Sequence, residues 1–151
     1  MADMFFSGSR LIVTDSRYKD VYNLLSKQSG LNINTIFLLT LLLGYRENRQ
    51  GQGLKQGGAE FRPSYFKQEQ KLIILGIIYE LFGKDTLNNI DDSSLLKEIE
   101  EKLQLYSNGG MEILLENFLG SNLINGEFVT TYTNADIDLL KFIFEKLSVH
   151  H

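Results

Sequence analysis

The sequence contains no cysteine and no tryptophan, has one proline, and has histidine only at its last two positions. Without cysteine the chain cannot form disulfides, thiolate zinc sites, iron–sulfur clusters or a cysteine nucleophile. With histidine confined to His150 and His151, which are native residues or the remnant of a purification tag, His-based triads and His-rich metal sites are also disfavoured. We therefore predict a protein without a cofactor and without a metal site.

Long hydrophobic runs are missing as well. The most apolar stretch, residues 36–43, is eight residues long, whereas a membrane-spanning helix needs about 20. The first nine residues lack the basic and apolar regions of a secretory signal. We expect no contact with a membrane and a cytoplasmic location.

The 151 residues are 43% hydrophobic and 23% charged, which is typical of one compact domain. A chain of this length buries roughly 70% of its extended surface and folds without a metal or a disulfide. We therefore treat residues 1–151 as a single helical domain.

Apolar residues recur at the spacing of a helix in six segments. Gly30 and Gly83 stand where two of these helices should end, and Asp91 or Asp92 can cap a third. The turn Asn108-Gly109-Gly110 is predicted to separate the fourth helix from the fifth. The expected fold is an all-α bundle of about six helices, with residues 10–14 as a candidate short strand and residues 127–132 as a candidate extended segment. The helices are predicted at residues 16–29, 35–46, 64–83, 94–106, 111–119 and 133–147.

A segment rich in glycine and glutamine, residues 47–63, is predicted to be a long basic loop within this domain. Loops longer than about 12 to 15 residues are usually functional or disordered, and both interpretations stay open here. Its glycines do not form a phosphate-binding loop, because no Gly-Lys-Ser/Thr follows them.

Enzymatic residues are not evident in the sequence. Neighbouring carboxylates occur at Asp91-Asp92, at residues 98–101, and at Asp136 with Asp138. Acid–base catalysis needs carboxylates in a shared, desolvated cleft. These groups are instead predicted at helix starts or on polar helix faces, so we predict no catalytic residue and a protein that is not an enzyme.

The charge is divided unevenly along the chain. Residues 1–71 carry ten basic and six acidic side chains, whereas residues 72–151 carry five basic and thirteen acidic ones. Aromatic groups among the cations of the loop region can stack on bases while the cations contact phosphates, or the same surface can meet an acidic protein. The alternative is a solvated loop anchored by its aromatics. The candidate nucleic-acid or partner-binding residues are Arg46, Arg49, Lys55, Arg62, Tyr65 and Lys67.

Three segments resemble small accessory proteins associated with bacterial DNA phosphorothioation (Dnd-type) modification and restriction systems. They are Arg-Tyr-Lys-Asp-Val-Tyr-Asn-Leu-Leu at residues 17–25, the apolar segment 36–46 ending in Gly-Tyr-Arg, and Tyr-Ser-Asn-Gly-Gly-Met-Glu-Ile-Leu at residues 106–114. The resemblance implies a setting in bacterial defence, with protein components of a modification or restriction complex as partners. It supplies no catalytic residues to carry over. The expected function is a non-enzymatic accessory, adaptor or regulatory protein that contacts DNA or a protein partner.

A second resemblance is to ribbon-helix-helix proteins, which are dimers that bind DNA through a two-stranded ribbon. The candidate strand 10–14, the first helix and the second helix follow in the same order. This resemblance implies a homodimer that contacts DNA through its N-terminal segment, and it is the alternative hypothesis.

Overall fold

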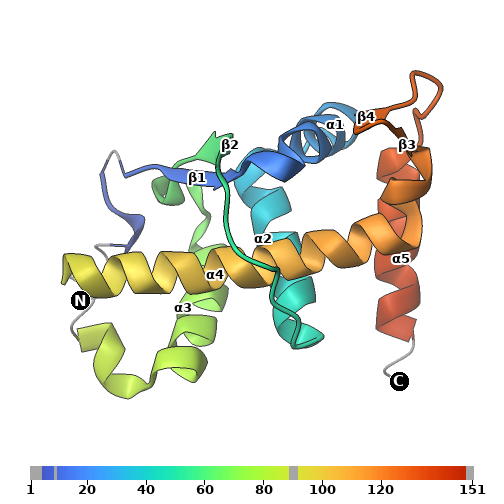
Figure 1. Ribbon diagram of the computed structural model, residues 1–151. Coiled ribbons are helices and arrows are strands. Elements are labelled where there is room, and N and C mark those ends of the chain that lie inside the picture. The colour runs from blue at the N-terminus through green and yellow to red at the C-terminus, as the bar shows by residue number, and fades with distance from the viewer. Residues whose placement is uncertain (1–4, 9, 89–91, 149–151) are drawn as a thin grey trace.

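The computed structural model describes residues 5–8, 10–88 and 92–148 (Figure 1). His150 and His151 lie outside these residues. In the described part of the chain, five α-helices are accompanied by two antiparallel sheets of two strands each. Short single-turn helices connect several of these elements. The elements are β1 (Ile12–Asp15), α1 (Lys19–Ser29), α2 (Ile33–Arg46), β2 (Gln56–Phe61), α3 (Gln68–Phe82), α4 (Ser93–Leu114), β3 (Leu123–Ile124), β4 (Glu127–Phe128) and α5 (Ala135–Ser148).

The prediction of an all-α fold is therefore wrong, because the chain is mixed α and β. The candidate strand at residues 10–14 forms as β1, and its partner β2 lies inside the predicted loop 47–63. Ile12 pairs with Phe61, and the Thr14 hydroxyl donates to the Ala59 carbonyl over 2.6 Å. A glycine-rich strand was missed because its pairing is with a segment about 45 residues earlier, which no local pattern reveals.

The prediction of six helices is also wrong. The fourth and fifth predicted helices form one continuous α4, which runs through Asn108-Gly109-Gly110 and continues as a π-helical turn at Leu115–Leu119. Glycine costs about 1 kcal/mol in a helix interior, so its presence predicted a break. The helix persists because the two glycines lie in a tight contact with α2 and the segment after it.

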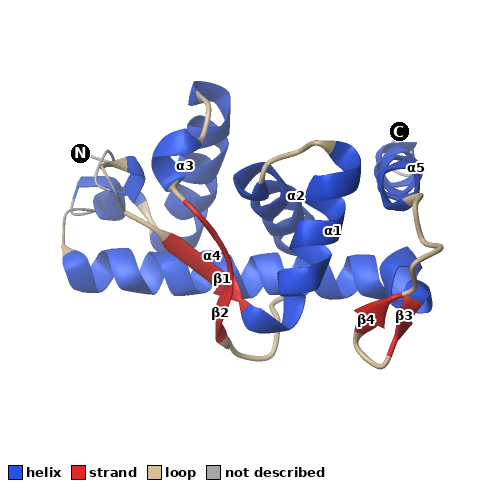
Figure 2. Cartoon of the chain, turned by 90° about the horizontal axis from the view of Figure 1, so that it is seen from above, coloured by secondary structure: helices blue, strands red, loops and turns tan. Residues whose placement is uncertain are grey.

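Helix α4 runs the length of the molecule, with α3, α2 and α5 standing in that order along it in both views (Figures 1 and 2). The closest crossing is between α2 and α4. A Cβ atom on Gly44 would lie 1.9 Å from the Tyr106 carbonyl oxygen, and one on Gly110 would lie 1.9 Å from the Thr40 carbonyl oxygen. Only glycine lets the two backbones approach this closely.

The hydrophobic core lies around this crossing. It includes the fully buried Leu25, Leu41, Ile78 and Ile99, and a group of aromatic rings in which Phe61 contacts Phe37 and Phe66. No helix in the described residues is long and apolar enough to cross a membrane.

Candidate functional site

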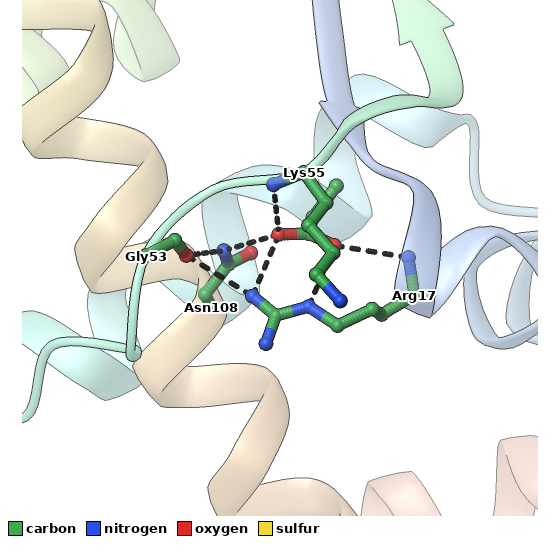
Figure 3. Close-up of polar contacts among 5 residues, drawn as sticks. Arg17, Gly53, Lys55 and Asn108 are labelled. Atoms are coloured by element: carbon green, nitrogen blue, oxygen red, sulfur yellow. Dashed lines mark hydrogen bonds and ion pairs between the residues drawn. The ribbon is translucent and has the colours of Figure 1, made fainter.

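A buried carboxylate, Asp15 at the end of β1, organises the most extensive polar cluster of the described residues (Figure 3). Its side chain has no exposed surface. Arg17 donates to it from its backbone N–H and from its guanidinium, the closest of these contacts being 2.8 Å. The Lys55 backbone N–H donates over 2.9 Å and the Asn108 side-chain amide over 3.1 Å.

The charge of Asp15 is stabilised by these donors. Burial alone would raise its pKa, but the hydrogen bonds from Arg17 and from the Lys55 backbone together lower it below the ordinary value for aspartate. Arg17 and Asn108 also donate to the Gly53 carbonyl oxygen. The cluster therefore fastens the connection between α2 and β2 onto α4 and β1. Its acceptor atoms are engaged within the fold, which is the arrangement of a structural anchor.

Buried hydroxyl groups form a second cluster where α1, α2 and α4 meet. Ser107 lies 2.6 Å from the Thr40 hydroxyl and 3.2 Å from the Tyr22 hydroxyl. Burial raises the pKa of Tyr22 to about 12. Asn108 belongs to the anchor, Gly109 packs against the Arg49 backbone after α2, and Gly110 packs against α2 itself. Residues 107–110 therefore serve packing and hydrogen bonding.

Three further carboxylates pair with arginines: Glu100 and Glu112 on α4, and Glu116 in the π-helical turn after it. Glu112 and Glu116 bind the Arg49 guanidinium at 3.2 Å and 2.5 Å. Glu100 is mostly buried, and this burial raises its pKa, which the neighbouring Arg10 lowers in part. In these pairs, arginines from the basic first half of the sequence contact glutamates from the acidic second half. The positive and negative charges that are separated along the chain therefore lie side by side in the folded protein.

The six candidate binding residues do not form one surface. Arg46 ends α2, whereas Arg62 and Tyr65 line a hollow beside the start of the same helix. A helix of 14 residues places these ends about 20 Å apart. Arg49 is neutralised by its two carboxylate partners. The exposed Lys55 engages the anchor through its backbone.

Arg62, Tyr65 and Lys67 remain together as an exposed group before α3. The Tyr65 ring is 66% exposed, and Lys67 begins α3 through a backbone hydrogen bond to the Gln70 side chain. Glu60 lines the same hollow as Arg62 and Tyr65. Among the predicted binding residues, these three are both exposed and close together in the chain.

An apolar groove between α2 and α5 is the feature that the sequence did not predict. One hollow of about 140 Å³ lies between the two helices, and a second continues it toward the start of α5. The two hollows share Leu39, Leu139 and Ile143. Both hollows are lined mainly by apolar side chains, which suits contact with apolar side chains of another protein chain. We call this feature the α2–α5 groove.

Exposed apolar side chains flank the groove and form a second patch on α3. On α5, Ile137, Leu140 and Phe144 are 49%, 69% and 71% exposed. On α3 the exposed residues are Leu72, Ile73 and Tyr79, at 59%, 43% and 47%. We call these the α5 stripe and the α3 face.

The sequence does carry a signal for these surfaces. Both helices have more apolar residues than one buried stripe needs, and a helix that is apolar on most sides requires a second surface to cover it. In the described residues, no group of three or more histidine, cysteine, aspartate or glutamate side chains could hold a metal ion.

Comparisons with protein families, with curated proteins and with solved structures find no match for this chain. The candidate site therefore rests on the geometry of the described residues.

Proposed function

We propose that this chain is a non-enzymatic adaptor or regulator that binds other protein chains through its exposed apolar surfaces. The observation that carries the proposal is the pair of such surfaces on helices at either side of α2: the α3 face and the α5 stripe with its groove. Contiguous apolar patches on a protein surface mark contact sites, because water contact with them is unfavourable. An adaptor needs two surfaces, and these two are separated along α4 (Figure 2).

A binding role agrees with the finding that the polar groups around Asp15 are engaged in hydrogen bonds within the fold. In the largest polar cluster of the described residues, Asp15 is buried and its carboxylate accepts hydrogen bonds from Arg17, Lys55 and Asn108. The resemblance in three segments supports a place for the adaptor in a cytoplasmic assembly that modifies or restricts bacterial DNA.

The test is affinity capture by the tagged protein from a bacterial lysate, with and without nuclease. We expect a captured protein that survives nuclease treatment and is lost when Leu72 on the α3 face is replaced by aspartate. Ile124→Asp is the matched control, because it places the same charge at an exposed apolar residue that belongs neither to the α3 face nor to the α5 stripe. Capture that disappears with nuclease, or that is unaffected by Leu72→Asp and by Leu140→Asp, contradicts the proposal.

Contact with DNA is a second candidate function, favoured by the exposed group Arg62, Tyr65 and Lys67. Cations beside an exposed aromatic ring suit a phosphate backbone with an unstacked base. The alternative in which β1 contacts DNA has less support, because Ile12, Thr14 and Asp15 are buried and β1 already pairs with β2 of the same chain.

A further inference from the structure

Along the side of α5 that faces the groove, the start of the helix is acidic and its end is basic. Asp136 lines the hollow at the start of the helix, and Lys146 lines the hollow at its end, next to Arg46 of α2. Between them the lining side chains are apolar: Ile137, Leu139, Leu140, Phe142 and Ile143.

The other charged residues of this helix lie on a different side. Asp138, Lys141 and Glu145 line a polar hollow with Asn117 and Asn122, which belong to the region after α4. Of the basic groups at the groove's end, Lys146 is 3.5 Å from Glu47, while Arg46 is exposed. The groove thus has an acidic end at Asp136 and, about 15 Å away along α5, a basic end at which Arg46 is exposed and Lys146 is paired with Glu47.

This distribution of charge is self-complementary. When one copy is turned end to end, its acidic end meets the basic end of the other copy. A two-fold axis makes any contact between residue i of one copy and residue j of the other occur twice. With two α5 helices antiparallel and the axis near Leu140, Ile137 of each copy lies beside Phe144 of the other. The same rotation brings Asp136 of each copy to the basic end of the other copy's groove.

We propose that a second copy of this chain occupies the α2–α5 groove, forming a two-fold dimer through antiparallel α5 helices. The α5 stripe of each copy covers the groove of the other, and the α3 face of each copy remains open. This inference rests on the proposed adaptor function and assigns one of its two surfaces. The resulting protein is a bivalent adaptor with two α3 faces.

The first experiment is sedimentation equilibrium of the purified protein between about 1 and 100 µM, the range in which a moderate interface is half dissociated. We expect a dimer, and we expect Leu140→Asp to weaken it by about 100-fold, since a charge would enter the centre of an apolar contact. Leu72→Asp is the matched control, because it places the same charge at a leucine of similar exposure on the α3 face. Circular dichroism verifies that both variants are folded.

A charge exchange tests the orientation of the two copies. Asp136→Arg alone and Arg46→Asp alone should each weaken the dimer by about tenfold, because symmetry changes two contacts at once. The double variant should recover most of the affinity. Asp136 and Arg46 lie at opposite ends of the groove within one chain, so recovery requires that they meet between copies.

Three results overturn the dimer. The wild-type protein could be monomeric throughout the concentration range, Leu140→Asp could leave a dimer unchanged, or the charge exchange could fail to restore association. A monomer that still captures a protein dependent on Leu140 or Leu72 would refute the second copy and leave the adaptor function standing. A monomer that captures no protein would refute both.

Discussion

Replacing Gly110 by alanine tests whether the glycines of α4 exist for the helix crossing. Alanine has the higher helix propensity and would by itself stabilise the helix by about 1 kcal/mol. Its Cβ, however, would lie 1.9 Å from the Thr40 carbonyl oxygen and 3.0 Å from the Gly44 nitrogen, both of which are backbone atoms of α2. Because these atoms cannot rotate away, the two helices would have to separate by about 1 Å to reach even the shortest distance that real Cβ contacts show.

A gap of that size forfeits roughly a quarter to a half of the dispersion energy of the atoms that face it. Overpacking of a core typically costs about 1 to 3 kcal/mol, and here the displaced atoms belong to the main helix crossing. We expect Gly110→Ala to lower the free energy of unfolding by about 2 kcal/mol or more, after allowing for the gain in helix propensity.

The matched control is Gly76→Ala in the interior of α3. Gly76 is exposed, and a Cβ there would have no atom within 4 Å apart from its own helix and chain neighbours. This variant should therefore be more stable than the wild type by about 0.5 to 1 kcal/mol. Urea denaturation followed by circular dichroism measures both. If Gly110→Ala is as stable as Gly76→Ala, the close approach of α2 and α4 does not exist as described.

Three further predictions concern the polar groups. Asp15→Asn should lower the free energy of unfolding by about 2 to 4 kcal/mol, because the amide would place a donor among donors and remove a buried charge. Since the pKa of Asp15 is lowered in the folded protein, the stability that its charge contributes is present above about pH 4 and is lost as the pH falls through the folded pKa. A stability difference between wild type and variant that does not shrink in acid contradicts this role. Tyr22→Phe should lower the free energy of unfolding by about 1 kcal/mol in the same urea assay by removing its contact with Ser107. An unchanged midpoint would show that the Tyr22 hydroxyl contributes no net stability. In fluorescence titrations with single-stranded DNA at two salt concentrations, Arg62→Gln should reduce the salt dependence of binding by about one ion and Arg49→Gln by less. Equal effects of the two variants would exclude the exposed group before α3 as the contact.

Local sequence signals located most of the helices. Gly30 ends α1 with φ of 76°, Gly83 ends α3, and the Asp92 side chain accepts hydrogen bonds from the backbone N–H groups of Ser94 and Leu95. These signals are reliable because a helix end is decided by residues within one turn of it. The β-branched residues of segment 10–14 are likewise a local signal, and they indicated the strand there.

The candidate surface was less predictable than the helices. The sequence placed six binding residues in and beside the loop 47–63, and the structure separates Arg46 from Arg62 by the length of α2 and occupies Arg49 with carboxylates of α4. A charge counted along the chain does not show which other charge it will meet after folding. Nor does an apolar helix position show whether another element will cover it, as Leu140 and Leu72 demonstrate.

The sequence by itself determined where most helices lie and the chemistries that the absence of cysteine excludes, since both follow from residue identity and spacing along a few turns. Tertiary structure alone decided that β2 forms within the predicted loop, that α4 continues through Gly109 and Gly110, and that Asp15 is an anchor. Each of these depends on atoms far away in sequence: β1 for the strand, the Thr40 carbonyl for the helix, and Asn108 for the carboxylate. Their energies arise only when the chain brings the distant partners together.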